Sequence, residues 1–554
     1  MTRTIVVGGG VAGLATAALL AREGHDVHLL ERRDDVGGRA GSLDRNGFRF
    51  DVGPSWYLLP RVFDHFFEML GTTTDEQLDL VHLDPAYAVF SEPTDPATLL
   101  APLVVPLGRS SVEAVFEQRE PGAGRRLHSH LDSATRTTEM AERFFLYNPW
   151  TRPTSLLHPE VLRSLPTLVG LLTRSLQAYV ARRFTDPVLR QVLGYPAVFL
   201  GASPAMAPAM YHLMSALDLG DGVQYPRGGF WALVQRLADL AGQQGVRVTT
   251  GAEVTAITTT PQRRFGRRRS RVTGVAWRDA AGTTHHETAE VVVSAADLHH
   301  TETRLLGPDD RSYPQRWWNR RTSGPGAVLV MLGVRGELPQ LPHHSLFFTR
   351  DWDANFAAIF DGDGPPPDPT SIYVCKPSQT DPEVAPAGHE NLFVLVPVAA
   401  DPGLGAGGPE GTGSAQVERI ADAAIAQVGA WAGVPDLAER AVVRHTIGPA
   451  DFADQYHSWR GGMLGPAHTL RQSAMFRPHN ASRRVAGLYY AGATTSPGVG
   501  VPMCLISAEL VLKRIRGDHS AGPTPIPTTD ETRTRSWQHP HADAAGCASW
   551  CRPR

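Results

Sequence analysis

The sequence predicts an α/β fold that opens with a Rossmann-type dinucleotide-binding domain. Three observations support this prediction. A β-branched run is followed directly by Gly8, Gly10 and Gly13 in the spacing G-x-G-x-x-G. An acid, Glu31, ends a second apolar run about 20 residues farther on, and a glycine pair follows at 37–38. At the first glycines a tight turn, close approach of backbone to a pyrophosphate and close helix packing all exclude a Cβ.

The same residues indicate which dinucleotide is bound. A helix expected from about Val11 would direct its N-terminus at the phosphates, where backbone N–H groups and the helix dipole favour an anion. Glu31 stands where a carboxylate accepts hydrogen bonds from ribose hydroxyls, and an acid there disfavours the 2′-phosphate of NADP. Together these features predict a bound dinucleotide, and FAD in particular.

Length and composition predict an intracellular enzyme of two or more domains. The chain has 554 residues, of which 42% are hydrophobic and 20% charged, which is enough for a sizeable core. A formal net charge of −3 gives no reason to expect a nucleic acid as partner. Four cysteines cannot form a disulfide framework for a chain of this size, which favours a reducing compartment.

No membrane-spanning segment is expected. A strand begins at about residue 3, which leaves no room for a signal peptide before it. The chain has no run of about 18 apolar residues, and shorter runs such as 97–107 are interrupted by proline. The sequence therefore predicts a chain that does not cross a bilayer but is able to lie on one.

Farther along the chain, strand and helix patterns alternate with glycine-rich turns. Strands are expected within 246–257, 290–297, 327–333, 391–396 and 487–491, and helices at 231–241, 417–432 and 502–515. Gly/Pro-rich loops at 361–370 and 400–414 are expected to be exposed. These patterns predict a discontinuous FAD-binding domain, at 1–85, 225–300 and 441–516, and a mixed α+β substrate-binding and membrane-facing domain, at 86–224 and 301–440.

The C-terminal residues 517–554 have the composition of a disordered tail. Cys547 and Cys551, with His539 and His541 upstream, suggest a metal clip. A Cys-x₃-Cys pair without a second cluster is a poor zinc pattern, so no metal site is predicted.

Laid end to end, the motifs resemble those of bacterial phytoene desaturases, which are carotenoid desaturases within the amine-oxidase-like FAD superfamily. The resemblance covers about residues 3 to 515 and includes the segments 8–13, 37–39, 50–55, 225–229, 251–254, 470–480 and 488–502. The first segment is shared by the whole superfamily, whereas the last is much more specific to carotenoid desaturases. The chain departs from the family pattern at 92–112 and after 517.

The resemblance implies a set of FAD-binding residues and no catalytic side chain that can be named. It places residues at the pyrophosphate, the adenosine ribose, the flavin, the adenine, and the ribityl and pyrimidine end. In that order they are Gly8, Gly10, Ala12 and Gly13; Glu31 and Arg32; Gly38 and Arg39, which also reach the phosphates, with Gly53, Pro54 and Ser55; Val254; and Gly492, Val501, Pro502 and Met503.

The resemblance also implies a reaction, in which phytoene, a C40 hydrocarbon, is desaturated to a polyene such as neurosporene or lycopene. Hydride would pass to flavin N5. The sequence does not identify the acceptor that reoxidises the flavin: a quinone or oxygen is the first candidate and NAD(P) stays open, although nothing indicates a second dinucleotide fold. Because the substrate has no polar handle, a long apolar channel is expected. Because it dissolves in membranes, the resemblance implies a cytoplasmic protein bound peripherally to the inner face of the cell membrane.

Two local hypotheses follow from residue spacing. Glu160 and Arg163 are expected on one helix face. Glu160 is either a proton acceptor with Arg163 as its partner, or the two residues form a surface ion pair. Residues 161–184 carry an apolar stripe flanked by arginines. This pattern is typical of a helix that lies in a membrane interface and of an amphipathic helix that packs on the protein core.

The sequence motifs are also compatible with rival functions. A flavin amine oxidase of the same superfamily, or a carotenoid isomerase, ketolase or other desaturase, shares most of these motifs. A non-catalytic prenyl-lipid-binding protein is a rival of another class, although it would need no intact pyrophosphate loop.

Overall fold

The computed structural model describes residues 1–95, 97–152, 157–264, 267–362 and 366–526. A five-stranded parallel sheet forms the nucleotide-binding half. Its strands, in spatial order, are β20 (Leu488–Tyr490), β13 (Val291–Ser294), β1 (Arg3–Val7), β2 (Asp26–Leu30) and β9 (Arg247–Thr249). The predicted α/β fold with a Rossmann-type sheet is confirmed.

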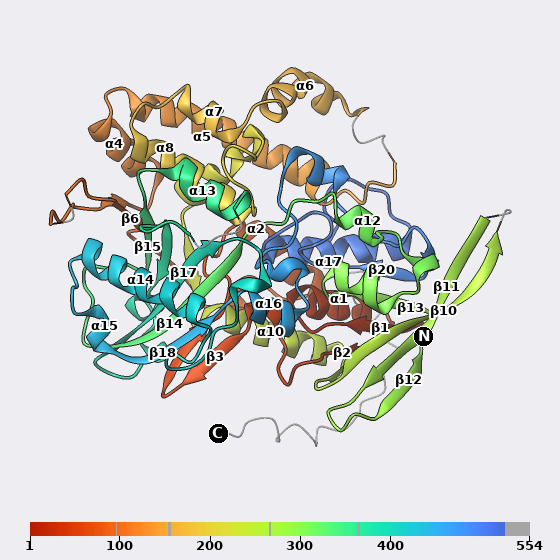
Figure 1. Ribbon diagram of the computed structural model, residues 1–554. Coiled ribbons are helices and arrows are strands. Elements are labelled where there is room, and N and C mark those ends of the chain that lie inside the picture. The colour runs from red at the N-terminus through yellow and green to blue at the C-terminus, as the bar shows by residue number, and fades with distance from the viewer. Residues whose placement is uncertain (96, 153–156, 265–266, 363–365, 527–554) are drawn as a thin grey trace.

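Helix α1 (Val11–Arg22) lies at the centre of this half, beside α17 (Val501–Arg516) and α10 (Gly229–Gln243) (Figure 1). Ten consecutive residues of α1, from Val11 to Leu20, are buried. A helix that is apolar all round must be covered on every side, and the sheet with these two helices supplies the cover.

A seven-stranded mixed sheet forms the second half. Its strands, in spatial order, are β18 (Ala441–Ile447), β14 (Gly326–Arg335), β17 (His389–Val398), β16 (Ile372–Cys375), β15 (His344–Phe348), β6 (Tyr87–Ser91) and β7 (Leu103–Val105). Because β18 pairs with β14, residues 441–447 lie in this sheet and not in the nucleotide-binding domain, to which the sequence had assigned them. Strand β7 lies within 92–112, where the sequence departs from the family pattern.

The two faces of this sheet pack against different partners. Helix α14 (Ala415–Ala432) covers one face, where Val328, Val330 and Leu332 of β14 are buried. Leu329 and Met331, which alternate with them, belong to the core shared with the nucleotide-binding half. The period of two in side-chain direction therefore lets one strand serve two cores.

A helical layer covers the edge of both halves. It consists of α4 (Arg109–Arg119), α5 (Ala123–Ala141), the π-helical turn Glu142–Leu146, α6 (Pro159–Leu172), α7 (Leu176–Ala181) and α8 (Pro187–Gly194), at the top of Figure 1.

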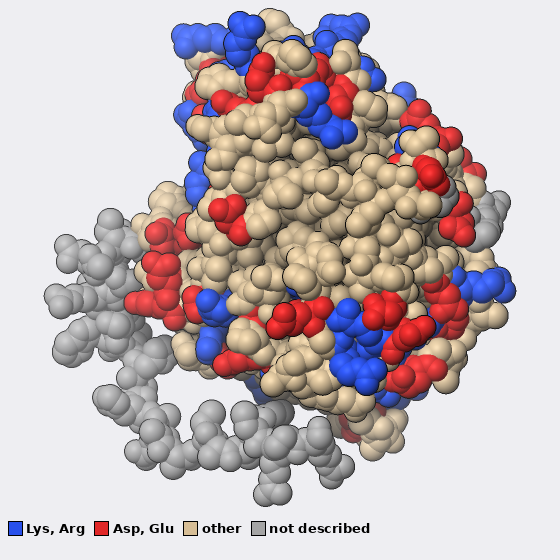
Figure 2. All heavy atoms as spheres, turned by 90° about the vertical axis from the view of Figure 1, so that its left-hand side faces the viewer, with Lys and Arg blue, Asp and Glu red and all other residues tan. Residues whose placement is uncertain are grey.

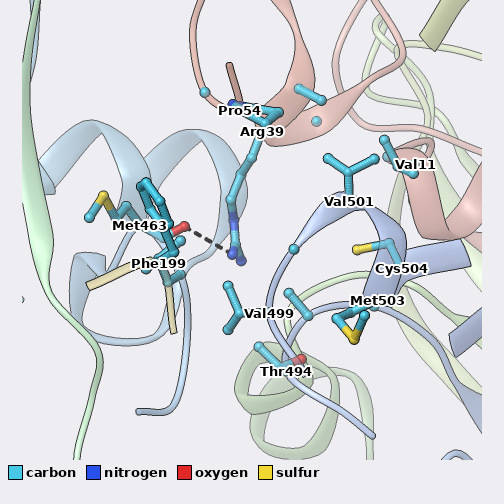
Figure 3. A pocket seen from close by; sticks show the side chains of 18 of the residues that line it. Val11, Arg39, Pro54, Phe199, Met463, Thr494, Val499, Val501, Met503 and Cys504 are labelled. Atoms are coloured by element: carbon cyan, nitrogen blue, oxygen red, sulfur yellow. Dashed lines mark hydrogen bonds between the residues drawn. The ribbon is translucent and has the colours of Figure 1, made fainter. Parts of the chain in front are cut away.

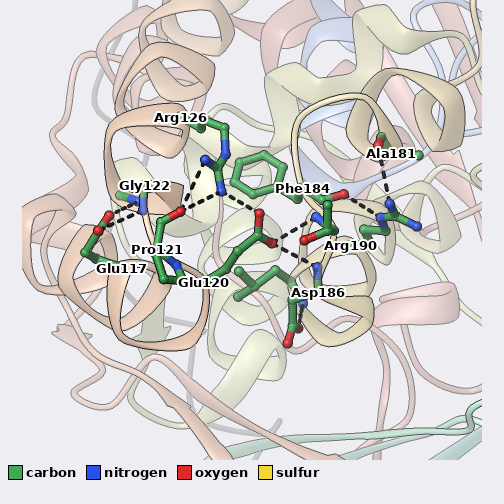
Figure 4. A network of polar contacts seen from close by, with 12 residues as sticks. Glu117, Glu120, Pro121, Gly122, Arg126, Ala181, Phe184, Asp186 and Arg190 are labelled. Carbon is green, nitrogen blue, oxygen red and sulfur yellow. Dashed lines mark hydrogen bonds and ion pairs between the residues drawn. The ribbon is translucent and has the colours of Figure 1, made fainter.

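Figure 4 shows how the layer is joined. The Glu120 carboxylate accepts hydrogen bonds from Arg126 at 2.5 Å and from the backbone N–H groups of Thr185 and Asp186 at 2.9 Å each. One carboxylate thus ties the turn between α4 and α5 to the start of α8.

A four-stranded sheet projects from the nucleotide-binding half (Figure 1, right). It consists of β10 (Glu253–Arg264), β11 (Arg267–Arg278), β12 (Thr284–Thr288) and β19 (Val485–Ala486). The remaining strands are β3 (Ser42–Arg45), β4 (Phe48–Asp51), β5 (Leu80–His82) and β8 (Gln224–Pro226). The remaining helices are α2 (Pro60–Leu70), α3 (Thr74–Gln77), α9 (Pro196–Phe199), α11 (Leu298–His300), α12 (Gln315–Trp318), α13 (Trp352–Phe360), α15 (Leu437–Arg440) and α16 (Pro449–Tyr456).

The start of the predicted tail packs against α17. Lys513 Nζ donates to the carbonyls of Ser520 and Gly522, and Thr524 N–H donates to Glu509 at 2.6 Å. These contacts contradict disorder for this part of the tail, whereas 527–554, with the candidate clip at 539–551, lie outside the described residues. Within the described ranges, no helix has both the length and the apolar character needed to cross a bilayer.

Candidate active site

A cavity of about 570 Å³ runs between the two halves of the molecule. One end lies at the carboxyl ends of β1, β2 and β13, and the other between the helical layer and the seven-stranded sheet. All of the predicted FAD-binding residues except Gly13 line this cavity. The structure therefore brings together residues from segments as distant as 8–12 and 492–503.

Gly13 packs against the glycine loop itself. A Cβ at this position would lie 1.9 Å from the carbonyl oxygen of Gly8, and Gly13 does not line the cavity. Its lack of a side chain lets α1 pack directly beneath the loop. Gly53 is similar, since a Cβ there would lie 2.0 Å from the Arg39 carbonyl oxygen, although Gly53 does line the cavity.

Two helix N-termini meet the cavity without side-chain caps. Gly10 precedes α1 and Gly500 precedes α17, and neither offers a side chain to the N–H groups of the first turn. Gly10, Val11, Gly500 and Val501 line the cavity. Uncapped N–H groups and helix dipoles form a site for anionic oxygens, so this end fits the pyrophosphate of FAD.

Glu31 shapes the loop as well as facing the cavity. Its carboxylate accepts hydrogen bonds from the N–H groups of Gly9 at 2.6 Å and Arg33 at 2.9 Å. Each carboxylate oxygen has a second lone pair, so acceptance of a ribose hydroxyl remains compatible with these bonds. The spacing argument predicted a ribose contact but missed this support of the glycine loop.

Arg39 extends into the cavity between its two walls. In Figure 3 it passes between Phe199 and Met463 on one side and Val501 on the other. Its guanidinium donates to the Met463 carbonyl at 3.2 Å and lies 3.8 Å from the buried Asp297 carboxylate. Burial raises the pKa of Asp297, and the positive charge of Arg39 opposes that rise.

The glycine-rich loop 492–500 is held by the segment before it. Arg477 is buried, and its guanidinium donates to the carbonyls of Ala493 at 2.8 Å and Thr495 at 3.2 Å. Asn480 donates to the Ser496 carbonyl at 2.9 Å. Burial lowers the pKa of Arg477 to about 10, which leaves it charged at neutral pH. The stretch 470–480 thus acts partly as a support for the cofactor loop.

The other end of the cavity is lined mainly by apolar side chains. They come from four helical elements, α5, the π-helical turn Glu142–Leu146, α9 and α13, and from the seven-stranded sheet, and include Ala141, Phe145, Phe199, Leu346, Phe348, Trp352, Phe356, Ile359, Phe393 and Leu395. Among the described residues, the carboxylates that line the cavity are Glu31, Glu253 and Asp297. All three lie at the nucleotide end, so the apolar end offers no acid to a cationic substrate.

Glu160 is not placed to act on a substrate. Its carboxylate pairs with Arg143 at 2.9 Å, its side chain is partly exposed, and it does not line the cavity. The surface alternative is therefore the correct one for Glu160. No sequence signal pointed to Trp56, Tyr373 or Phe348, because aromatic residues of separate strands reveal their common cavity only after folding.

Comparisons with known proteins agree with this geometry. The family model described as flavin containing amine oxidoreductase matches residues 11–515. A carotenoid 3,4-desaturase of Haloarcula japonica is 41% identical over 505 residues, which cover 91% of this chain and 96% of the relative. A zeta-carotene-forming phytoene desaturase of Myxococcus xanthus is 33% identical and covers 93% of each chain.

Solved structures show the same fold at low identity. An oxidoreductase from Methanosarcina mazei gives a TM-score of 0.57 at 17% identity, covering 92% of this chain and 100% of that one. Putrescine oxidase bound to putrescine gives 0.56 at 15% identity, covering 93% and 99%.

The chain belongs to the flavin containing amine oxidoreductase family. Within that family it belongs with the carotenoid desaturases, as an FAD-dependent oxidoreductase that acts on CH–CH bonds. FAD is its cofactor, in agreement with the sequence prediction, and the glycine cradle and the two uncapped helix N-termini fit it. The roles of individual residues toward FAD remain predictions.

Proposed function

We propose that this enzyme desaturates an acyclic C40 carotenoid, with phytoene as substrate and a neurosporene- or lycopene-type polyene as product. The observation that carries the proposal is the apolar end of the cavity, which adjoins the cofactor end and to which no described residue contributes a carboxylate. Each CH₂ group buried there contributes about 0.8 kcal/mol, so a long hydrocarbon gains affinity without a charged contact.

Bound FAD supplies the hydride acceptor, and the protein supplies position and exclusion of water. Leu346 and Phe348 of β15 and Phe393 of β17, the two strands that flank β16, form an apolar wall on one sheet, which would keep a straight hydrocarbon in line. Arg39 and the N-terminus of α17 lie between this wall and the nucleotide end, where positive charge would stabilise electron density arriving on the cofactor.

A second candidate is introduction of a double bond between carbons 3 and 4 of a carotenoid. The specific observation in its favour is the 41% identity to a carotenoid 3,4-desaturase, against 33% to a phytoene desaturase. Expression of the chain in cells that accumulate phytoene, and separately in cells that accumulate lycopene, distinguishes the two. New pigment from phytoene supports the first, and conversion of lycopene alone supports the second.

Amine oxidation would be indicated by a third outcome. If purified FAD-loaded protein is bleached at about 450 nm by primary amines and not by either carotenoid, the proposal is wrong. We expect no amine to bleach it, because the apolar end lacks the acid that an ammonium group requires.

Peripheral membrane binding through α6 is the second part of the proposal. Leu162, Leu165 and Val169 are each 48% exposed and lie on one face of α6. The adjacent face of the helix is buried, with Val161 and Leu168 packed near Phe144. Because one face is already buried, the exposed stripe is available for the acyl region of a membrane.

The position of α6 connects this surface with the cavity. Helix α6 packs on the turn Ala209–Leu213, from which Met210 and Leu213 line the cavity. The segment 474–476 contributes Ala474 to the cavity and Phe476 to the surface, where it is 57% exposed. A carotenoid leaving a bilayer at this surface would meet the apolar end first.

Liposome flotation tests the membrane surface. The triple variant Leu162→Ser, Leu165→Ser, Val169→Ser is expected to remain with the soluble fraction, while the native chain floats. The matched control is Leu99→Ser with Val104→Ser, which alters exposed apolar residues beside β7. That side, which faces the viewer in Figure 2, carries charge at its margins and little in its centre. If the control loses flotation and the α6 variant keeps it, the membrane-binding surface lies beside β7 and not on α6.

The electron acceptor is proposed to be a quinone or oxygen. A quinone shares the membrane with the substrate, so reoxidation by a quinone in liposomes is expected to exceed reoxidation by dissolved oxygen.

A further inference from the structure

We propose that Ser55, Tyr373, His344, His343 and Thr380 form a proton route from the apolar cavity to the protein surface. This inference rests on the proposed desaturation, for which it supplies the exit of the second hydrogen. Ser55 was expected near the flavin, whereas the other four residues carried no sequence signal.

The route begins at the cavity wall. Ser55 and Tyr373 both line the cavity. The Ser55 Oγ lies 2.5 Å from the Tyr373 hydroxyl oxygen, and that oxygen lies 2.8 Å from Nδ1 of His344. These hydrogen bonds join three side chains from 50–55 and from two paired strands, β15 and β16.

His344 is fully enclosed and held in place. Its ring stacks on Trp56, with ring centres 4.6 Å apart and planes inclined by 14°. Its Nε2 is buried and has no hydrogen-bond partner in the part of the chain that the structure describes, and the same holds for Nε2 of His343. Buried ring nitrogens without partners are costly, so two in adjacent residues require an explanation.

The second half of the route begins at His343. One ring nitrogen of each histidine and Sγ of Cys375 all lie within 4.8 Å of one another. A gap of this size can be bridged by one water molecule or by the thiol. His343 Nδ1 lies 2.7 Å from the hydroxyl of Thr380, which is half-buried and follows the exposed Gln379.

The chemistry requires such a route. Desaturation breaks C–H bonds on two adjacent carbons and forms a C=C bond. One hydrogen leaves as hydride, carrying two electrons to oxidised FAD, and the other leaves as a proton, while its bonding pair becomes the new π bond. The apolar end offers this proton no carboxylate, so a hydroxyl that passes protons onward is the available acceptor.

The lowered pKa values of the two histidines favour transfer of the proton along the route over its retention on either ring. Burial lowers the pKa of His344 well below its usual range, and burial together with nearby Lys376 lowers the pKa of His343 to about 3. Both rings are therefore neutral at rest and hold a proton only in transit. Tyr373 donating to His344 Nδ1 would leave the resting hydrogen of His344 on Nε2.

Tyr373→Phe tests the route, because it removes one hydroxyl and keeps the ring in the cavity wall. The matched control is Tyr87→Phe, at a buried tyrosine that also packs against Trp56 but bonds Asp218 and does not line the cavity. The first readout needs no cofactor. In ¹⁵N-histidine-labelled apoprotein, we expect one neutral histidine with Nδ1 as acceptor, changed by Tyr373→Phe and unchanged by Tyr87→Phe. A signal unaffected by Tyr373→Phe would overturn the hydrogen-bond route.

The second readout is anaerobic single turnover with substrate-loaded liposomes. We expect flavin bleaching on the order of 100-fold slower in Tyr373→Phe at equal FAD content, with native rates in Tyr87→Phe. Bleaching at the native rate in Tyr373→Phe overturns the route and leaves the proposed desaturation standing. Absence of bleaching in the native chain overturns the desaturation, and the apoprotein spectrum still decides the hydrogen bonds. A metal ion bound stoichiometrically by His343, His344 and Cys375 in purified protein would also overturn the route.

Discussion

The two ends of the cavity are built from different materials. At the cofactor end, backbone groups form most of the site, through glycine loops and the uncapped N-termini of α1 and α17. At the apolar end side chains from four helices and a seven-stranded sheet form the wall. The first construction recognises charge and shape that all FAD molecules share, whereas the second can change its substrate by changing side chains alone.

The largest expected effect is at the cofactor end. Gly13→Val should abolish FAD binding, because its Cβ would lie 1.9 Å from the Gly8 carbonyl and force α1 away from the loop. The ratio of absorbance at about 450 nm to protein absorbance measures the loss. The control is Gly242→Ala, a helical glycine with nothing within 4 Å of a built Cβ. It should keep full FAD and gain about 1 kcal/mol of stability.

A substitution at the apolar end should change the products and leave FAD binding intact. Phe348→Leu keeps an apolar side chain on β15 but shortens the wall, so FAD content should stay native while the pigment profile changes severalfold. Chromatography of pigments from expressing cells measures the change. Loss of FAD in this variant, with pigments in native proportion, would show that the two ends are not separable.

Asp218 provides a smaller test, behind the apolar wall. Its buried carboxylate accepts hydrogen bonds from Tyr195 at 2.9 Å and Tyr87 at 3.3 Å. Burial raises the pKa of Asp218 to about 7, and the hydrogen bonds from Tyr195, the Leu219 backbone and Tyr87 oppose that rise. The folded chain thus holds this proton more tightly than the unfolded chain, whose value is about 3.9.

The sign of the pH effect follows from that difference. The stability from this proton is complete below about pH 4 and is lost as the pH rises through about 7. Asp218→Asn should therefore reduce the fall in unfolding temperature between pH 5.5 and 8.5. Parallel curves for the native chain and the variant would show that Asp218 does not titrate in this range.

The sequence predictions succeeded at the cofactor end of the cavity and failed mostly at the apolar end. The glycine loops, Glu31 and the closing segment 488–502 are local patterns, because contiguous residues build each turn, and they could be read without a structure. Gly13 fits the same glycine pattern but packs against Gly8 and does not line the cavity, since the ligand side and the packing side of a tight turn have the same sequence requirement. The exchange of β18 into the second sheet and the cluster around Trp56 depend on long-range pairing, which no local spacing encodes.

Glu160 illustrates the same limit at the level of chemistry. Its spacing from Arg163 was consistent with a catalytic pair, but the partner that folding supplies is Arg143, at the surface. His343 and His344 carried no sequence signal, because their shared neighbourhood with Tyr373 and Cys375 forms only on folding.

The central claim is that one cavity holds FAD at its backbone-built end and a carotenoid at its apolar end, close enough for direct transfer. Its most direct test is anaerobic mixing of the FAD-loaded protein with phytoene in liposomes, recorded at about 450 nm and over the polyene bands. The account predicts that the flavin is bleached in step with the appearance of new conjugated product, one double bond for each flavin reduced. Flavin that stays oxidised with phytoene and with lycopene, in protein shown to contain FAD, would contradict it.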